Sequence, residues 1–156
     1  MRLHIISVGS KIPTWVEAGY QDYAQRLPAD FRLHLIEIPI KKRSANMPAN
    51  HAIQQEGEAI LKAIPKNAFV IALNIPGELW STEKLAEQLN TWRHNESDIC
   101  FIIGGPDGLA PECLKRAQLQ WSLSRLTLPH ALVRVILAEQ LYRAWSILHN
   151  HPYHRK

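Results

Sequence analysis

The sequence has little cysteine and no long hydrophobic run, and each shortage excludes a class of protein. Cys100 and Cys113 are its only cysteines, and they form no CxxC pair, which excludes a disulfide framework and a cysteine zinc site. No apolar run approaches the ~20 residues that a membrane-spanning helix needs. Residues 1–13 lack the long apolar region and small-residue cleavage site of a signal peptide. These absences predict a cytoplasmic protein with buried, inert thiols.

Acidic residues are the minority among the charged side chains. The chain has 18 Lys and Arg against 14 Asp and Glu, a formal net charge of +4 and a pI of about 9.2. This excess favours an acidic partner, and nucleic acid is the most common one. The length of 156 residues and the hydrophobic content of 46% suit one globular domain. No repeat or linker divides the chain, so this domain is predicted to span residues 1–156.

Strand-like and helix-like segments alternate along the whole chain. The predicted strands cover residues 2–9, 32–39, 68–75, 98–105 and 121–128. The predicted helices cover residues 14–27, 53–64, 82–92, 111–118 and 130–150. Thr14 and Glu17 have capping-box spacing, and Ser81 can cap the third helix. The alternation predicts an α/β fold, a mostly parallel sheet with helices on both faces.

Turn-forming residues separate these segments. The polar, basic stretch 39–50 is bracketed by prolines and is expected to form a mobile loop, and residues 76–80 are expected to form a turn. The motif IGGPDGL (103–109) directly follows a predicted buried strand. It is neither a Walker A loop nor a GxGxxG motif, so it is either a plain tight turn or a place where a ligand approaches the backbone closely. Two other predicted strands end similarly, at residues 73–77 and 127–130. Since ligands bind at the carboxyl ends of parallel strands, we expect the three ends to form one pocket.

The C-terminal tail HNHPYHRK (149–156) admits three interpretations: a metal site, a solvated terminus, or part of an active site. His149 and His151 are two residues apart, which does not place them on one helical face, and no acidic residue or cysteine stands nearby. We therefore predict no metal site. Tyrosine and histidine can stack on a nucleobase, and arginine can bind phosphate or a pair of carbonyls, so the tail suits an acidic, planar substrate.

Other charged residues have simpler explanations. The run Lys41-Lys42-Arg43 is either solvated or a phosphate clamp. Glu139 and Arg143 are spaced i,i+4, as in a surface ion pair. Arg134 and Arg143 are nine residues apart on the last predicted helix, hence on opposite sides of it, and should not bind the same phosphate.

Taken together, IIGGPDGL and the run from Trp121 to Arg155 resemble the SPOUT class of methyltransferases, and more narrowly the ribosomal large-subunit RNA methyltransferase H family. The resemblance extends essentially from end to end and is strongest over residues 101–156. It implies a deep C-terminal trefoil knot, a homodimer whose active site is completed by both subunits, and no metal. Asp107 is a departure, because relatives often carry glutamate there.

The same resemblance implies the cofactor, the reaction and the site. S-adenosyl-L-methionine is expected in the knot, held by backbone of three loops that correspond here to Leu73, Gly104, Gly105, Leu123, Ser124, Arg125, Leu126, Thr127 and Leu128. The implied reaction is methylation of N3 of a pseudouridine in large-subunit (23S) ribosomal RNA. Residues expected near the target are Arg143, Tyr153, His154 and Arg155. A non-catalytic ribosome- or RNA-binding α/β module is the alternative, and a phosphate-binding nucleotide domain is a weaker one, because no lysine follows the glycines.

Overall fold

The computed structural model describes residues 1–96 and 98–155, so Lys156 of the tail lies outside the described residues. The strands are β1 (Arg2–Val8), β2 (Leu33–Ile38), β3 (Phe69–Leu79), β4 (Asp98–Ile103) and β5 (Leu119–Ser122). The helices are α1 (Thr14–Ala24), α2 (Ala49–Ala63), α3 (Thr82–Asn95), α4 (Pro111–Arg116) and α5 (His130–Leu148), with short 3-10 helices η1 (Ala29–Phe31) and η2 (Pro152–His154). The predicted alternation of strands and helices is confirmed.

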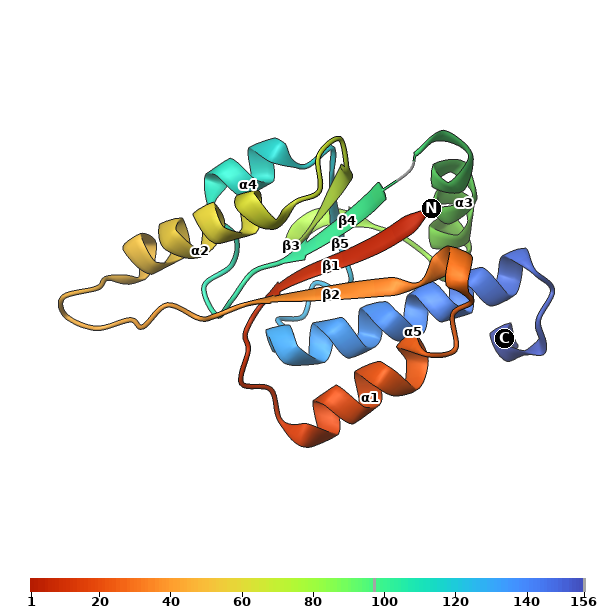
Figure 1. The fold of residues 1–156 in the computed structure, drawn as a ribbon, viewed down its shortest axis with the longest axis horizontal. Helices are drawn as coiled ribbons and strands as arrows, with labels where there is room; N and C mark the ends of the chain where they lie inside the picture. Colours follow the sequence, from red (N-terminus) through yellow and green to blue (C-terminus); the bar gives the residue numbers. More distant parts are fainter. Residues whose placement is uncertain (97, 156) are drawn as a thin grey trace.

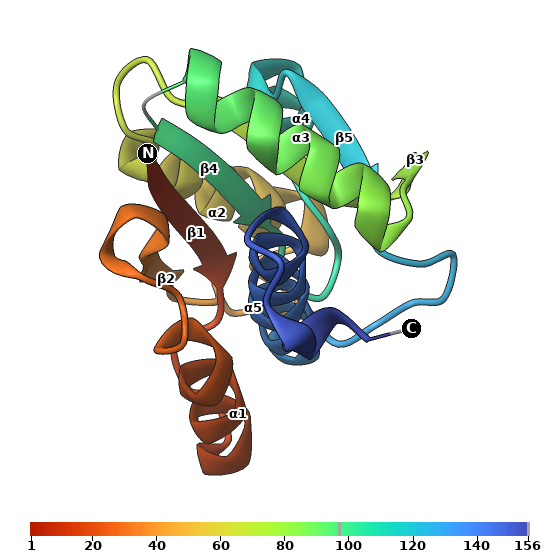
Figure 2. The same ribbon diagram turned by 90° about the vertical axis from the view of Figure 1, so that its right-hand side faces the viewer.

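The strands form one sheet in the order β2-β1-β4-β3-β5, and every neighbouring pair is parallel. Helices α1, α3 and α5 cover one face, and α2 and α4 cover the other (Figures 1 and 2). Alternate residues of a strand face opposite sides, so Phe101 of β4 packs in the α1/α3/α5 core and Cys100 in the α2/α4 core. The predicted α/β architecture with helices on both faces is therefore confirmed.

Both thiols are buried in the α2/α4 core. Burial raises the pKa of Cys100 to about 12 and that of Cys113 to about 11, so neither forms a thiolate near neutral pH. No helix of the described residues is long and apolar enough to cross a bilayer.

Two predicted strand boundaries were wrong at the edge of the sheet. The expected turn at residues 76–80 lies mostly within β3, which continues to Leu79 with a register irregularity between Leu73 and Glu78. The strand predicted at 121–128 is instead β5, which ends at Ser122. The alternation of residues 121–128 suggested a strand, but the serines turn the chain: Ser122 Oγ donates to Ser124 O, and Leu126 N donates to Ser124 Oγ.

The two predicted helix caps had different outcomes. Ser81 Oγ accepts a hydrogen bond from Lys84 N at 3.0 Å, so the cap of α3 is confirmed. Thr14 is already inside α1, whose N-cap is Pro13 without any side-chain cap, so the predicted capping box was wrong. A proline immediately before Thr14 already supplies the entry geometry, which leaves the Thr14 side chain no capping position.

Candidate functional site

A cavity of about 620 Å³ opens where the carboxyl ends of β3 and β4 meet the segment that joins β5 to α5. Its lining includes all but one of the predicted cofactor-binding residues: Leu73, Gly104, Gly105, Leu123, Ser124, Leu126, Thr127 and Leu128. Arg125 is the exception, because its guanidinium turns back to donate a hydrogen bond to Ile75 O. The three predicted segments thus surround one cavity, as expected, although residues 73–77 lie within β3 and residues 127–130 come after the end of β5.

The glycine motif forms a tight turn, and packing explains its two adjacent glycines. A Cβ on Gly104 would lie 2.5 Å from the backbone carbon of Gly108, so this position excludes any side chain. A Cβ on Gly105 would point at Val8, 3.0 Å from its Cγ1, and would also approach Glu56. The Cβ position of Gly105 therefore points at the packed side chains of Val8 and Glu56, and its backbone forms part of the cavity wall.

The cavity is almost free of ionisable groups. His130, the first residue of α5, is the one titratable side chain among its described lining residues. Burial, followed by the charge of Arg134, lowers the pKa of His130. The imidazole is thus neutral near pH 7, so neither a fixed cation nor a carboxylate lines the wall.

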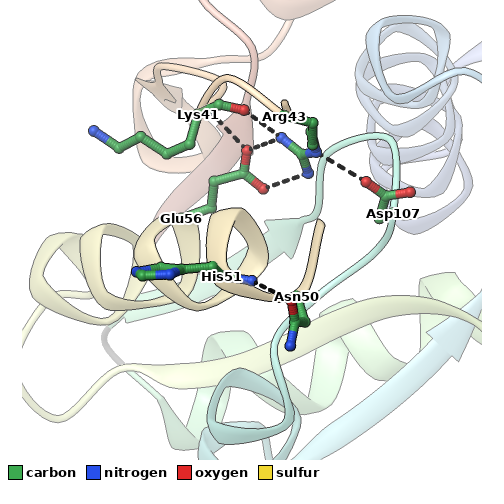
Figure 3. Close-up of polar contacts among 6 residues, drawn as sticks. All are labelled: Lys41, Arg43, Asn50, His51, Glu56 and Asp107. Atoms are coloured by element: carbon green, nitrogen blue, oxygen red, sulfur yellow. Dashed lines mark hydrogen bonds and ion pairs between the residues drawn. The ribbon is translucent and has the colours of Figure 1, made fainter. Parts of the chain in front are cut away.

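A network of ion pairs holds the glycine motif to the basic loop (Figure 3). Arg43 Nη1 and Nη2 donate to the two carboxylate oxygens of Glu56 at 2.6 and 3.1 Å, and Arg43 Nε donates to Asp107 Oδ2 at 2.9 Å. The Glu56 side chain is only 2% exposed, and it also accepts from Lys41 N. Arg43 therefore joins α2 to the turn at the cavity mouth. Because its guanidinium is already bound by carboxylates, this structure gives it no phosphate-clamp role.

The predicted catalytic residues lie elsewhere in the chain. Arg143, Tyr153, His154 and Arg155 are absent from the cavity lining, which α5 reaches with its first turn. α5 runs against the direction of the strands, so the tail lies at their amino ends (Figures 1 and 2). The tail, one interpretation of which was part of an active site, therefore lies away from the cavity of its own chain. Arg134 and Arg143 do face different surroundings, as predicted.

Within the tail, aromatic rings pack closely against α5. The ring of Tyr153 lies 4.6 Å from that of Tyr142, and the guanidinium of Arg143 lies 4.8 Å over it. Tyr153 Oη donates to Glu139 Oε1 at 3.0 Å. Burial and this bond raise the pKa of Tyr153 to about 12, so its hydroxyl keeps the proton near neutral pH. Across the described residues, no group of three or more His, Cys, Asp and Glu could hold a metal ion.

Sequence reasoning missed two residues of this site. Glu56 gave no signal, because an acidic residue on an amphipathic helix is usually solvated. Arg134 was expected only to lie apart from Arg143, but it is buried, one turn after His130 on α5, and donates to Glu37, Ser7 and Gly9 O. Gly9 also lies close to His130, because a Cβ on Gly9 would lie 2.9 Å from His130 Nε2.

Comparisons with known proteins show what this chain is similar to. A family model described as "Predicted SPOUT methyltransferase" matches residues 1–154. A relative from Marinomonas sp. (strain MWYL1), named "Ribosomal RNA large subunit methyltransferase H", is 54% identical over 155 residues, which are 99% of this chain and 100% of the relative. A solved structure of a probable methylase family protein from Haemophilus influenzae Rd KW20 has a TM-score of 0.53 and 15% identity, over 99% of this chain and 70% of that chain. That last likeness concerns the fold alone.

Proposed function

The chain belongs to the SPOUT methyltransferase family, and we propose that it methylates large-subunit ribosomal RNA with S-adenosyl-L-methionine as the methyl donor. The observation that carries this proposal is the single cavity formed by three strand ends at the glycine motif. The named relative, identical at 54% of positions, supports ribosomal RNA as the substrate. We place the reaction in the cytoplasm, where ribosomes are, and treat residues 1–156 as one domain with the family's trefoil knot.

The cavity suits this cofactor in size and charge. A volume of about 620 Å³ lies within the range of roughly 300–1,000 Å³ that ligand pockets occupy. S-adenosyl-L-methionine supplies an electrophilic methyl group on a positively charged sulfonium. A wall without lysine or arginine, and with His130 held neutral, does not repel that charge. Backbone of the segments at Leu73, at Gly104 with Gly105, and at Leu123–Leu128 is proposed to hold the cofactor.

The proposed target atom is N3 of a pseudouridine, a ring nitrogen between two carbonyls. Loss of the N–H proton to water or a base would leave negative charge on the nitrogen and both carbonyls. The N–C bond would then form as the methyl–sulfur bond breaks, which would release S-adenosylhomocysteine. Arg143 and Arg155 can stabilise that charge, while Tyr153 and His154 can stack on the ring or donate hydrogen bonds to it. With a pKa of about 12, Tyr153 acts as a donor and not as the base.

We further propose a homodimer in which the tail of one subunit completes the cavity of the other. Within one chain, the cavity and the tail lie at opposite ends of α5. Exposed apolar side chains gather at the cavity, where Ile75 is 41% and Leu126 72% exposed, and a second subunit would cover them. Without a second subunit, the cationic, aromatic tail would lie away from the cavity in which methyl transfer is proposed to occur.

Calorimetry tests the cofactor assignment. The purified protein should bind S-adenosyl-L-methionine and S-adenosylhomocysteine but not ATP. Binding of neither adenosyl compound would favour the non-catalytic RNA-binding alternative, and binding of ATP alone would favour a nucleotide-binding domain. A methyl-transfer assay with ribosomes, subunits and a naked RNA hairpin then tests the substrate. Because the proposed single domain offers RNA few contacts beyond the cavity and the tail, we expect the assembled ribosomal surface to be methylated best and the hairpin poorly.

A further inference from the structure

Glu139, on α5, lies at the centre of the polar contacts that hold the tail. Its Oε1 accepts from Arg143 Nε at 2.8 Å and from Tyr153 Oη at 3.0 Å, and it also lies 2.6 Å from Arg143 Nη2. Two of the four residues expected near the methyl-accepting base therefore meet on one carboxylate oxygen. An ordinary i,i+4 surface pair would involve Arg143 alone and would leave the tail out.

The second carboxylate oxygen of Glu139 ties this cluster to the body of the protein. Gln140 Nε2 donates to Glu139 Oε2 at 2.8 Å, and Thr82 Oγ1 of α3 donates to Gln140 Oε1 at 2.8 Å. The Glu139 side chain is only 17% exposed, compared with 72% for Glu87 in the surface pair with Lys84. A half-buried carboxylate with donors on both oxygens has one favoured orientation, so it can fix the groups bound to it.

Fixing these groups matters because the backbone bonds from the tail to α5 stop short of Tyr153: His149 N donates to Trp145 O and His151 N donates to Ser146 O. Tyr153 N donates to His151 Nδ1 within the tail itself, and the Tyr153 ring contacts Tyr142, Arg143 and Arg26. Ring contacts allow sliding and rotation, whereas a charge-assisted O–H···O bond sets direction and distance. Removing the Glu139 carboxylate therefore removes the charged partner that orients both the Tyr153 hydroxyl and the Arg143 guanidinium.

We propose that Glu139 is a positioning residue for methyl transfer, which holds the Arg143 guanidinium and the Tyr153 hydroxyl as one unit that meets the target base. The inference rests on the proposed function, since it assigns Glu139 a part in that reaction. Glu139 itself does not touch the substrate. Its effect passes through Arg143 and Tyr153, so it should change turnover and leave cofactor binding unaltered, because the cavity meets α5 at His130 and Val133 and Glu139 is not among its lining residues.

The test compares Glu139→Gln, Tyr153→Phe and the double variant with the wild-type protein. Glu87→Gln is the matched control, because it removes a glutamate of an exposed ion pair far from the tail in sequence. Glu139→Asp keeps the charge but shortens the side chain by one methylene, which separates reach from charge and covers the case in which the glutamine variant folds poorly. The readouts are kcat and KM for methylation of ribosomes, cofactor affinity by calorimetry, and titration of Tyr153 followed by ¹³C NMR at its Cζ.

We expect Glu139→Gln and Glu139→Asp to lower kcat at least ~tenfold, about 1.4 kcal/mol, with cofactor affinity within about twofold of wild type. In the Tyr153→Phe background, Glu139→Gln should cost clearly less than it does alone, because part of its effect is already lost. The NMR titration of Tyr153 should move to lower pH in Glu139→Gln than in wild type, because the carboxylate charge that raises the pKa of Tyr153 is removed. Tyr153 also faces Tyr23 of α1, Arg26 just after α1, Arg143 of α5 and His151 of the tail, which are unchanged.

Three results would overturn the inference: an unchanged kcat, effects of Glu139→Gln and Tyr153→Phe that multiply independently, or an unaltered titration of Tyr153. Failure of the proposed function has a different signature, since the wild-type protein would then bind no adenosyl cofactor. If the wild-type protein binds cofactor and methylates RNA but the Glu139 variants have the wild-type kcat, the positioning role is rejected and the proposed function stands.

Discussion

Replacing Arg43 by methionine is the sharpest test of how the glycine motif is held. The change keeps most of the apolar stem but removes the guanidinium that bridges Glu56 and Asp107. Glu56 is then left as a 2% exposed carboxylate with the Lys41 N–H as its remaining partner. Removing one partner of a buried ion pair typically costs ~3–5 kcal/mol of unfolding free energy. We expect about 3 kcal/mol, at the low end, because Arg43 is itself 21% exposed and the Lys41 contact survives.

Urea denaturation of wild type, Arg43→Met, Glu56→Gln and the double variant measures this cost. In the double variant no charge is stranded, and the glutamine carbonyl can still accept from Lys41 N. It should therefore be more stable than Arg43→Met alone, with a coupling of at least ~1 kcal/mol. Lys84→Met, which breaks an exposed pair, should change stability by less than about 0.5 kcal/mol. A loss below ~1 kcal/mol in Arg43→Met, or a double variant that loses the sum of the single effects, would refute the buried-pair reasoning.

The remaining predictions concern the cavity, the tail and the assembly. Gly105→Val should weaken cofactor binding at least ~tenfold in calorimetry, since its side chain must displace Val8, and unchanged affinity would mean that the pocket is misplaced. Deleting residues 152–156 should leave the melting curve nearly intact but lower methylation at least ~100-fold, and an intact rate would show the tail to be a solvated terminus. The full-length activity should survive EDTA, and loss restored by zinc would favour a metal site. Sedimentation at micromolar concentration should give twice the mass of one chain, and a fully active monomer would contradict the dimer. Because the pKa of His130 is lowered in the folded protein, its contribution to stability is present above about 6.5 and is lost as the pH falls through the lower folded value. His130→Gln should flatten that acid-side slope in pH-dependent urea melts, and an unaltered slope would be the contrary result.

The sequence was sufficient for the existence of five strands in a parallel sheet, because each strand carried its own local signal, but it did not predict the strand order β2-β1-β4-β3-β5. The buried run at β4 and the glycines after it located the cavity mouth correctly. The alternation of residues 121–128 was misleading, since a period of two arises in an irregular segment as easily as in a strand. What decided the outcome was the serine bonding at Ser122 and Ser124, together with the continuation of β3 to Leu79. The serine bonds are local, between residues two positions apart, and the strand interpretation overlooked them. The continuation of β3 beside β5 is a tertiary effect, which a one-dimensional pattern does not carry.

Charged residues were the least predictable part of the site. The run Lys41-Lys42-Arg43 has the composition of a phosphate clamp, yet Arg43 binds two carboxylates that lie 13 and 64 residues away in the chain. The spacing of Glu139 and Arg143 predicted their ion pair correctly, but nothing in the spacing indicated that Tyr153 joins it. Local periodicity identifies which residues share a helix face, and only the packed structure determines what meets that face.

The geometry of α5 makes a shared active site the simplest way to unite cavity and tail. α5 has 19 residues and is therefore roughly 28 Å long, with the cavity at its first turn. Residues 149–155, even if pulled out of η2 and fully extended, would span at most about 25 Å. The tail could therefore approach its own cavity only by unwinding η2 and giving up its contacts with Glu139 and Tyr142. Two copies related by a two-fold axis, with their α5 helices antiparallel, would bring each tail to the start of the partner's α5 without unfolding it. In a mixture of cavity-defective and tail-defective subunits, activity should then reappear, and its absence despite formation of mixed dimers would argue against this arrangement.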